Sequence, residues 1–73
     1  MKVTIESTGE IVVVNGVPCR VWEGVTERGI QVQALIPRIA AKANQDLAQF
    51  EKELKECRPP LAVPRAFPAR LIL

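Results

Sequence analysis

Few side chains in this 73-residue sequence could carry out catalysis. The chain contains two cysteines, Cys19 and Cys57, one serine, Ser7, and no histidine or tyrosine. A nucleophilic serine or cysteine needs a neighbouring base, so serine–histidine and cysteine–histidine arrangements are excluded. Two cysteines without histidine also cannot complete a four-ligand zinc site within one chain. We expect no metal and no cofactor, and we interpret both cysteines as buried thiols, with a disulfide or a reactive thiol as the alternatives.

The acidic residues and the glycines do not suggest an active site either. The acids of the segment 44–57 fall on the polar face of a predicted helix, where solvated carboxylates have no catalytic partner. The four glycines all fit turns or strand ends, and no phosphate-binding loop or dinucleotide motif is present. The sequence therefore predicts a protein that is not an enzyme.

The composition is that of one small globular domain. Apolar residues make up 48% of the chain and charged residues 25%. The start of the chain lacks the pattern of a signal peptide, and no apolar run is long enough to span a membrane, so we expect a cytoplasmic protein without membrane contact. The segment 1–57 has seven basic and eight acidic residues, whereas the remainder has three arginines and no acid: Arg58, Arg65 and Arg70. Three arginines are much weaker than the clustered basic face of a typical nucleic-acid-binding protein, so we expect no nucleic-acid binding. Binding through these three arginines remains the alternative.

The elements that must position any functional residue begin with a β-hairpin. Alternating apolar residues predict strands over 2–7, 10–14 and 17–25. Asn15 and Gly16 between valines are typical of a two-residue type I′ turn. This turn sets the expected pairs of the hairpin: Val14 with Val17, Val12 with Cys19, and Glu10 with Val21. The valines at 12, 14, 17 and 21 then share the face of Cys19, while the opposite face holds Ile11, Val13, Pro18, Arg20 and Trp22.

A further strand over 30–37 is predicted after the "TERG" turn. Gly29 suits the left-handed position at the end of this turn. If Val25 pairs with Ile30, the apolar side chains of the strand join the face of Cys19: Ile30, Val32, Ala34 and Ile36. A slip of one residue would move all of them to the other face, so we prefer this register.

The segment 44–57 has the apolar spacing of an amphipathic helix. Its stripe consists of Ala43, Leu47, Phe50, Leu54 and Cys57. Asn44 suits the N-cap, and Pro59 and Pro60 stop the helix. We expect Leu47, Phe50 and Leu54 to pack on Val12, Cys19, Val21 and Val32. The predicted fold is thus α+β, an antiparallel meander of about four strands with one helix on the Cys19 face, in a single domain over 1–58, and an extended proline-rich tail over 59–73.

The only tryptophan, Trp22, lies on the sheet face that this fold leaves without a helix. Three explanations account for an apolar sheet face that no helix covers. The tail can fold back and cover Trp22 with Leu61, Val63 or Phe67, the face can bind a second copy in a homodimer, or it can bind a different protein. Tryptophan and arginine are enriched at binding hot spots. The candidate binding residues are Arg20, Trp22, Arg28, Ile11 and Val13, with the helix surface of Glu51, Lys52 and Lys55 as the alternative.

Three segments, "VTIEST", "NGVPCRVWEGVTERGI" and "DLAQFEKEL", resemble a group of small accessory proteins carried by tailed phages and prophages of Gram-negative bacteria. The resemblance weakens in the tail, and it transfers no residue roles. It implies a context in which small phage proteins bind host proteins, including inhibitors of host defence systems. We therefore predict a protein-binding module directed at a host protein or protein complex in the bacterial cytoplasm. A nucleic-acid-binding accessory protein and a structural particle protein are the alternatives.

Overall fold

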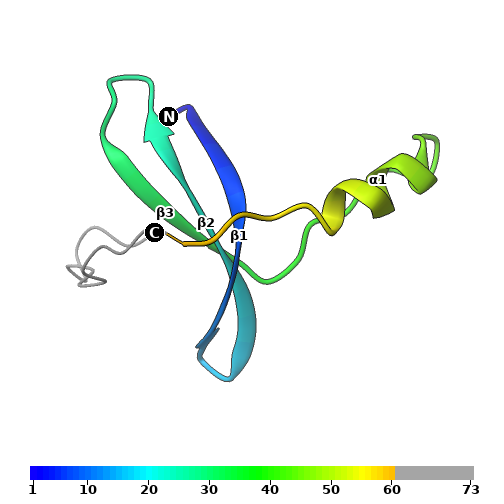
Figure 1. Cartoon of the computed structure of the whole chain (residues 1–73), viewed down its shortest axis with the longest axis horizontal. Coiled ribbons are helices and arrows are strands. Elements are labelled where there is room, and N and C mark those ends of the chain that lie inside the picture. Colours follow the sequence, from blue (N-terminus) through cyan, green and yellow to red (C-terminus); the bar gives the residue numbers. More distant parts are fainter. Residues whose placement is uncertain (61–73) are drawn as a thin grey trace.

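The computed structural model describes residues 1–60, which form a three-stranded antiparallel sheet followed by one short helix. The sheet consists of β1 (Val3–Val14), β2 (Val17–Thr26) and β3 (Gln31–Ile36), in the order β1-β2-β3, and the helix is α1 (Leu47–Leu54). Figure 1 shows α1 standing beside the sheet, with the chain after it crossing β1. The α+β class is confirmed. The predicted tail 59–73 lies outside the described residues from position 61 onward.

The first hairpin forms as its turn residues predict. Asn15 and Gly16 have φ angles of 50° and 79°, the positive values that a type I′ turn requires. Val14 pairs with Val17 and Val12 pairs with Cys19, as expected. The expected pair of Glu10 with Val21 is wrong, because the ladder is interrupted between Ser7 and Ile11.

The two predicted strands 2–7 and 10–14 form one strand with a bulge, so the expectation of four strands is corrected to three among the described residues. Ser7 pairs with Trp22 and Ile11 pairs with Arg20, so the three residues between them oppose the single residue Val21. The fully buried Thr8 closes the bulge: its hydroxyl donates to the Val21 carbonyl at 2.7 Å. A polar side chain satisfied in this way lets the chain bend without ending the strand.

The register of β3 also differs from the prediction. Val25 pairs with Gln31 rather than Ile30, a shift of one residue. The cause is the turn. The Thr26 N–H donates to the Ile30 carbonyl at 2.9 Å and the Gly29 N–H donates to the Thr26 carbonyl at 3.0 Å, with Gly29 at φ 80°. This turn leaves three residues in the loop instead of four, so three of the four apolar side chains of β3 share the face of Trp22: Val32, Ala34 and Ile36. The fourth, Leu35, pairs with Val21 on the opposite face.

The helix is shorter than predicted and lies on the other face. It begins after Asp46, whose carboxylate accepts the Gln49 N–H at 3.0 Å, so Asp46 replaces the predicted Asn44 as N-cap. It ends at Leu54, well before Pro59, and none of its residues is buried. Phe50 and Leu54 lie beside Trp22 and Ile36, so the predicted packing on the Cys19 face is wrong. The β3 register explains the change, because it moves three apolar side chains of that strand, including Ile36, to the Trp22 face.

The buried residues lie on the Cys19 side of β2 and at the bulge. Val21 and Thr8 are completely buried, and Cys19 and the charged Glu23 are almost completely buried. Cys57 is exposed, so the expectation that both thiols are buried is half wrong, and neither cysteine forms a disulfide. Among residues 1–60, no helix is long and apolar enough to cross a membrane.

Candidate functional site

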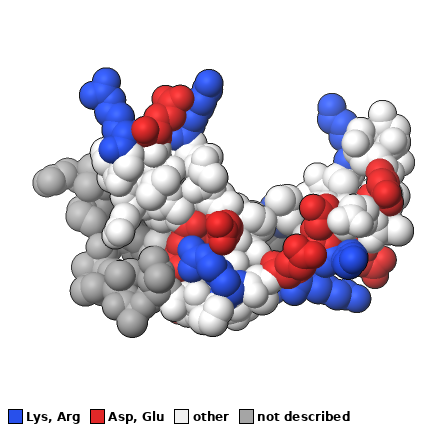
Figure 2. Space-filling model, turned by 45° about the horizontal axis from the view of Figure 1, so that its top comes forward, with Lys and Arg blue, Asp and Glu red and all other residues white. Residues whose placement is uncertain are grey.

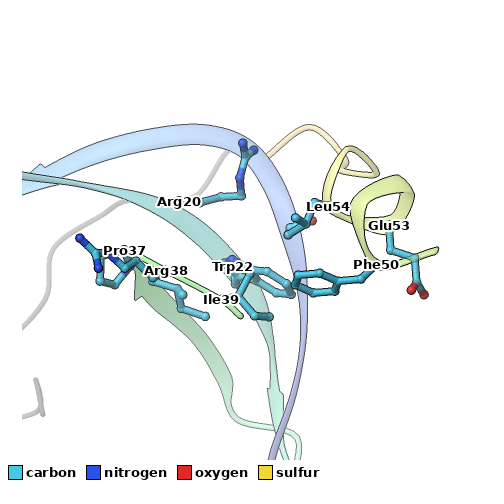
Figure 3. A pocket seen from close by; sticks show the side chains of 10 residues that line it. Arg20, Trp22, Pro37, Arg38, Ile39, Phe50, Glu53 and Leu54 are labelled. Carbon is cyan, nitrogen blue, oxygen red and sulfur yellow. The ribbon is translucent and has the colours of Figure 1, made fainter. Parts of the chain in front are cut away.

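A groove separates the Trp22 face of the sheet from α1. It encloses about 320 Å³, with an apolar floor and walls formed by Trp22, Ile36, Ile39, Phe50 and Leu54. Arg20, Arg38 and Glu53 lie at its edge. In Figure 3 the Phe50 ring points from the helix toward the Trp22 ring, and Leu54 lies one turn farther along the same helix face. We call this hollow the sheet–helix groove.

Trp22 lies in the groove because of its neighbours across the sheet. Strand alternation places it on the face opposite Cys19, and its cross-strand partners are Ser7 on β1 and Ala34 on β3. Both partners are small, so neither covers the indole from the side. Trp22 therefore remains half-buried, with Phe50 as its large apolar neighbour from the helix.

The two arginines at the groove edge differ in how they are held. The Arg20 Nη1 donates to the Thr8 carbonyl at 2.7 Å, so the bulge in β1 fixes this guanidinium. Arg38 follows β3 and Pro37 and is exposed. Within the described part of the chain, Arg38 has neither an ion pair nor a side-chain hydrogen bond. Arg38 is thus an arginine at the groove whose guanidinium is not engaged by another described residue.

A second hollow continues the groove on the other side of Trp22. It encloses about 540 Å³ and shares Ser7, Trp22 and Glu53 with the first. Its additional charged residues are Glu6, Glu56 and Arg58. Figure 2 shows the molecule hollowed between the sheet and the helix, with acidic side chains gathered where the two parts meet. The continuous groove therefore has arginine at one end and an excess of glutamate at the other.

Arg58 anchors the chain that leaves the helix. Its backbone N–H donates to the Ser7 carbonyl at 3.1 Å, and its carbonyl accepts the Gly9 N–H at 2.9 Å, in the gap that the bulge opens. Its guanidinium reaches Glu6 at 3.2 Å and Glu23 at 2.9 Å. Glu6 and Glu23 are directly opposite each other in the ladder, so the guanidinium offsets the repulsion between two carboxylates.

This polar row continues across the sheet to β3. The Gln33 Nε2 donates to the second Glu23 carboxylate oxygen at 3.0 Å. On the other side, the Ser7 hydroxyl donates to the Glu56 carbonyl at 2.8 Å. The segment after α1 is thus tied to the sheet, and β3 leads into the segment before α1. These attachments hold the helix beside the Trp22 face and keep the groove open.

The structure brings together only part of the predicted site. Arg20 and Trp22 both line the groove. Ile11 and Val13 lie on the hairpin arm, 51% and 68% exposed, and do not line the groove. Arg28 lies in the turn between β2 and β3, outside the groove.

The alternative sites are affected in different ways. Glu51, Lys52 and Lys55 are exposed and do not line the groove. Arg58 is occupied by two carboxylates, which weakens the nucleic-acid hypothesis, while Arg65 and Arg70 lie outside the described residues. The predicted cover of Trp22 by Leu61, Val63 or Phe67 also lies outside them.

Sequence reasoning missed the helix side of the groove and the segment after β3. The missed residues are Ile36, Arg38, Ile39, Phe50, Glu53 and Leu54. The signal that would have found Ile36 is the turn from Thr26 to Ile30, because a three-residue loop ending in glycine shifts β3 and brings Ile36 to the Trp22 face.

Comparison of the chain with models of protein families, with curated proteins and with solved structures finds no match. Within residues 1–60, no group of three or more cysteine or acidic side chains is placed to hold a metal ion. The functional argument therefore depends on the geometry of the groove.

Proposed function

We propose that this protein is a protein-binding module without catalytic activity, and that the sheet–helix groove is its binding site. The observation that carries the proposal is the half-buried Trp22 at the floor of a groove between a sheet and a helix with no buried residue. Two apolar surfaces that would normally pack against each other are held apart here. An aromatic floor with a fixed arginine beside it has the composition of an interface hot spot.

The partner we propose is a host protein in the cytoplasm of a bacterium, consistent with the resemblance to small phage proteins. Binding to a component of a host defence or regulatory complex would then inhibit that complex. The occupied state of Arg58 favours a protein over a nucleic acid, since one arginine of the basic set already contacts two carboxylates.

Photo-cross-linking from inside and outside the groove tests this proposal. A benzophenone amino acid is placed at Phe50, inside the groove, or at Lys52, on the outer surface of the same helix, and the protein is produced in a bacterial host. We expect a defined cross-linked protein from position 50 and none from position 52.

The cross-linked protein is then purified and mixed with the unmodified chain. Trp22 is the only tryptophan and the chain has no tyrosine, so the part of the emission that disappears in the Trp22→Ala variant reports on the groove. Binding should shift the emission to shorter wavelength, and Trp22→Ala should weaken capture at least tenfold while leaving the circular dichroism spectrum unchanged. Equal cross-linking from both positions, or unchanged capture by a folded Trp22→Ala variant, would refute the proposal.

A further inference from the structure

The charges along the groove specify the kind of segment it would accept. Building on the proposed function, we infer that the groove binds a polypeptide segment with a short apolar anchor, an acidic side chain at one end and a basic side chain at the other. Three observations carry this inference: the apolar centre, the unpartnered arginine at one end, and the unpartnered glutamates at the other.

The apolar centre is short. Trp22, Phe50 and Leu54 surround a volume of about 320 Å³, near the lower limit of cavities that hold small ligands. This volume accommodates a few side chains and not the whole face of a long helix. The affinity of an occupant would come from burying these side chains against the two aromatic rings. Its selectivity must then come from the edges of the groove.

One edge favours an anion. Arg38 is exposed at the groove and has no partner within residues 1–60. Arg20 lies at the same hollow with Nη1 fixed on the Thr8 carbonyl, so its position is set before any partner arrives. A guanidinium binds a carboxylate through paired N–H groups more specifically than an ammonium does. An aspartate or glutamate on the partner is the side chain that fits this edge.

The other edge favours a cation. Glu56 lines the second hollow and Glu53 lines both hollows, and neither carboxylate has an ion pair or hydrogen bond within the described residues. The Glu56 carbonyl accepts the Ser7 hydroxyl, so the backbone that carries this acid is fixed to the sheet. Glu6 lies nearby but already contacts Arg58. A lysine or arginine of the partner would relieve the repulsion between these acids.

This arrangement of charge distinguishes the occupant from other macromolecules. A nucleic acid or an anionic membrane surface would be attracted at Arg38 and repelled at Glu53 and Glu56. A segment with mixed charge is complementary along the whole groove. The order of charges is read along the groove and not along the chain direction of the partner, so a peptide can satisfy it in either orientation.

Three peptides with the same tryptophan-free apolar centre test the inference. Their flanks carry two glutamates and two lysines, four glutamates, or four lysines. Binding to the full chain is measured by Trp22 emission at about 50 mM salt, where exposed charges are weakly screened. We expect the mixed peptide to bind most tightly, by about twofold to fivefold for each favourable charge pair, and the difference to shrink at high salt.

Charge-reversed variants should change this preference in a defined direction. Arg38→Glu should favour the lysine peptide, with Arg28→Glu in the β2–β3 turn as the matched control. The double variant Glu53→Lys, Glu56→Lys should favour the glutamate peptide, with Glu51→Lys on the outer helix surface as its control. Both controls should keep the preference for the mixed peptide.

The outcomes separate this inference from the proposed function. Binding of all three peptides with equal affinity, or unchanged preference in the charge-reversed variants, would overturn the inference and leave the proposed function in place. Failure of all three peptides to bind would also overturn the inference. The proposed function would then be decided by cross-linking from position 50, which does not depend on the peptide sequence.

Discussion

Removing the guanidinium of Arg58 should destabilise the protein strongly, although Arg58 lies near the end of the described chain. The substitution Arg58→Met keeps the length of the side chain and removes its charge. The Glu23 side chain is only 4% exposed, so its carboxylate would lose a cation at 2.9 Å without gaining solvent. Glu6, directly opposite in the ladder, would face Glu23 with no charge between them.

The expected magnitude follows from burial. Removing one partner of a buried ion pair costs about 3–5 kcal/mol. The Arg58 side chain is 33% exposed, so solvent screens part of the attraction and we expect a loss of about 2 kcal/mol in the free energy of unfolding. Arg58→Lys should lose about half as much unfolding free energy. Lysine keeps the positive charge, but one ammonium cannot reach both carboxylates as the guanidinium does.

The assay is urea unfolding followed by circular dichroism, with an exposed ion pair as the matched control. Lys2 and Glu27 are 4.0 Å apart and largely exposed, so Lys2→Met should cost about 0.5 kcal/mol or less. A double-mutant cycle with Glu23→Gln isolates the interaction between Arg58 and Glu23. The double variant should lose less unfolding free energy than the sum of the losses in the two single variants. If Arg58→Met and Lys2→Met lowered stability equally, the argument from burial would be refuted.

Two further predictions use the same unfolding assay. Gly24→Ala should lower the free energy of unfolding by about 3 kcal/mol, because a Cβ there would overlap the Thr4 carbonyl oxygen and lie 2.7 Å from the Ile5 Cα. The control Gly16→Ala, at φ 79° with no atom within 4 Å, should lower it by about 1 kcal/mol. The opposite order would contradict the close approach of β1 and β2 at Gly24. Phe50→Ala should lower the free energy of unfolding by about 1 kcal/mol, because Phe50 is half-buried at a groove. A phenylalanine in a packed core would cost about 3–5 kcal/mol. A loss above about 3 kcal/mol would therefore show that the helix packs closely on the sheet.

The features that the sequence predicted correctly are local. Asn15 and Gly16 adopt positive φ because asparagine tolerates the left-handed region and glycine has no Cβ. A two-residue turn then dictates the pairing of the valines beside it. The alternation along β2 likewise placed Trp22 and Arg20 on one face and Cys19 and Val21 on the other. In each case the cause lies within a few residues of its effect.

Two misjudged features are also local but depend on small differences in backbone hydrogen bonding. The predicted strands 2–7 and 10–14 left a break at Thr8 and Gly9, yet the Thr8 hydroxyl donates to the Val21 carbonyl and the strand continues through a bulge. One extra hydrogen bond at Thr26 shortens the second turn by one residue. Because side chains alternate along a strand, that single residue exchanges the faces of β3.

The sequence by itself determined the hairpin, the amphipathic helix stripe and the face on which Trp22 lies. The tertiary structure decided which sheet face the helix meets, and therefore where the groove forms. It also decided that Glu23 is buried, because its arginine lies 35 residues farther along the chain. A local pattern fixes which residues share a face of one element, but the partner of that face is chosen by long-range contacts that the pattern does not contain.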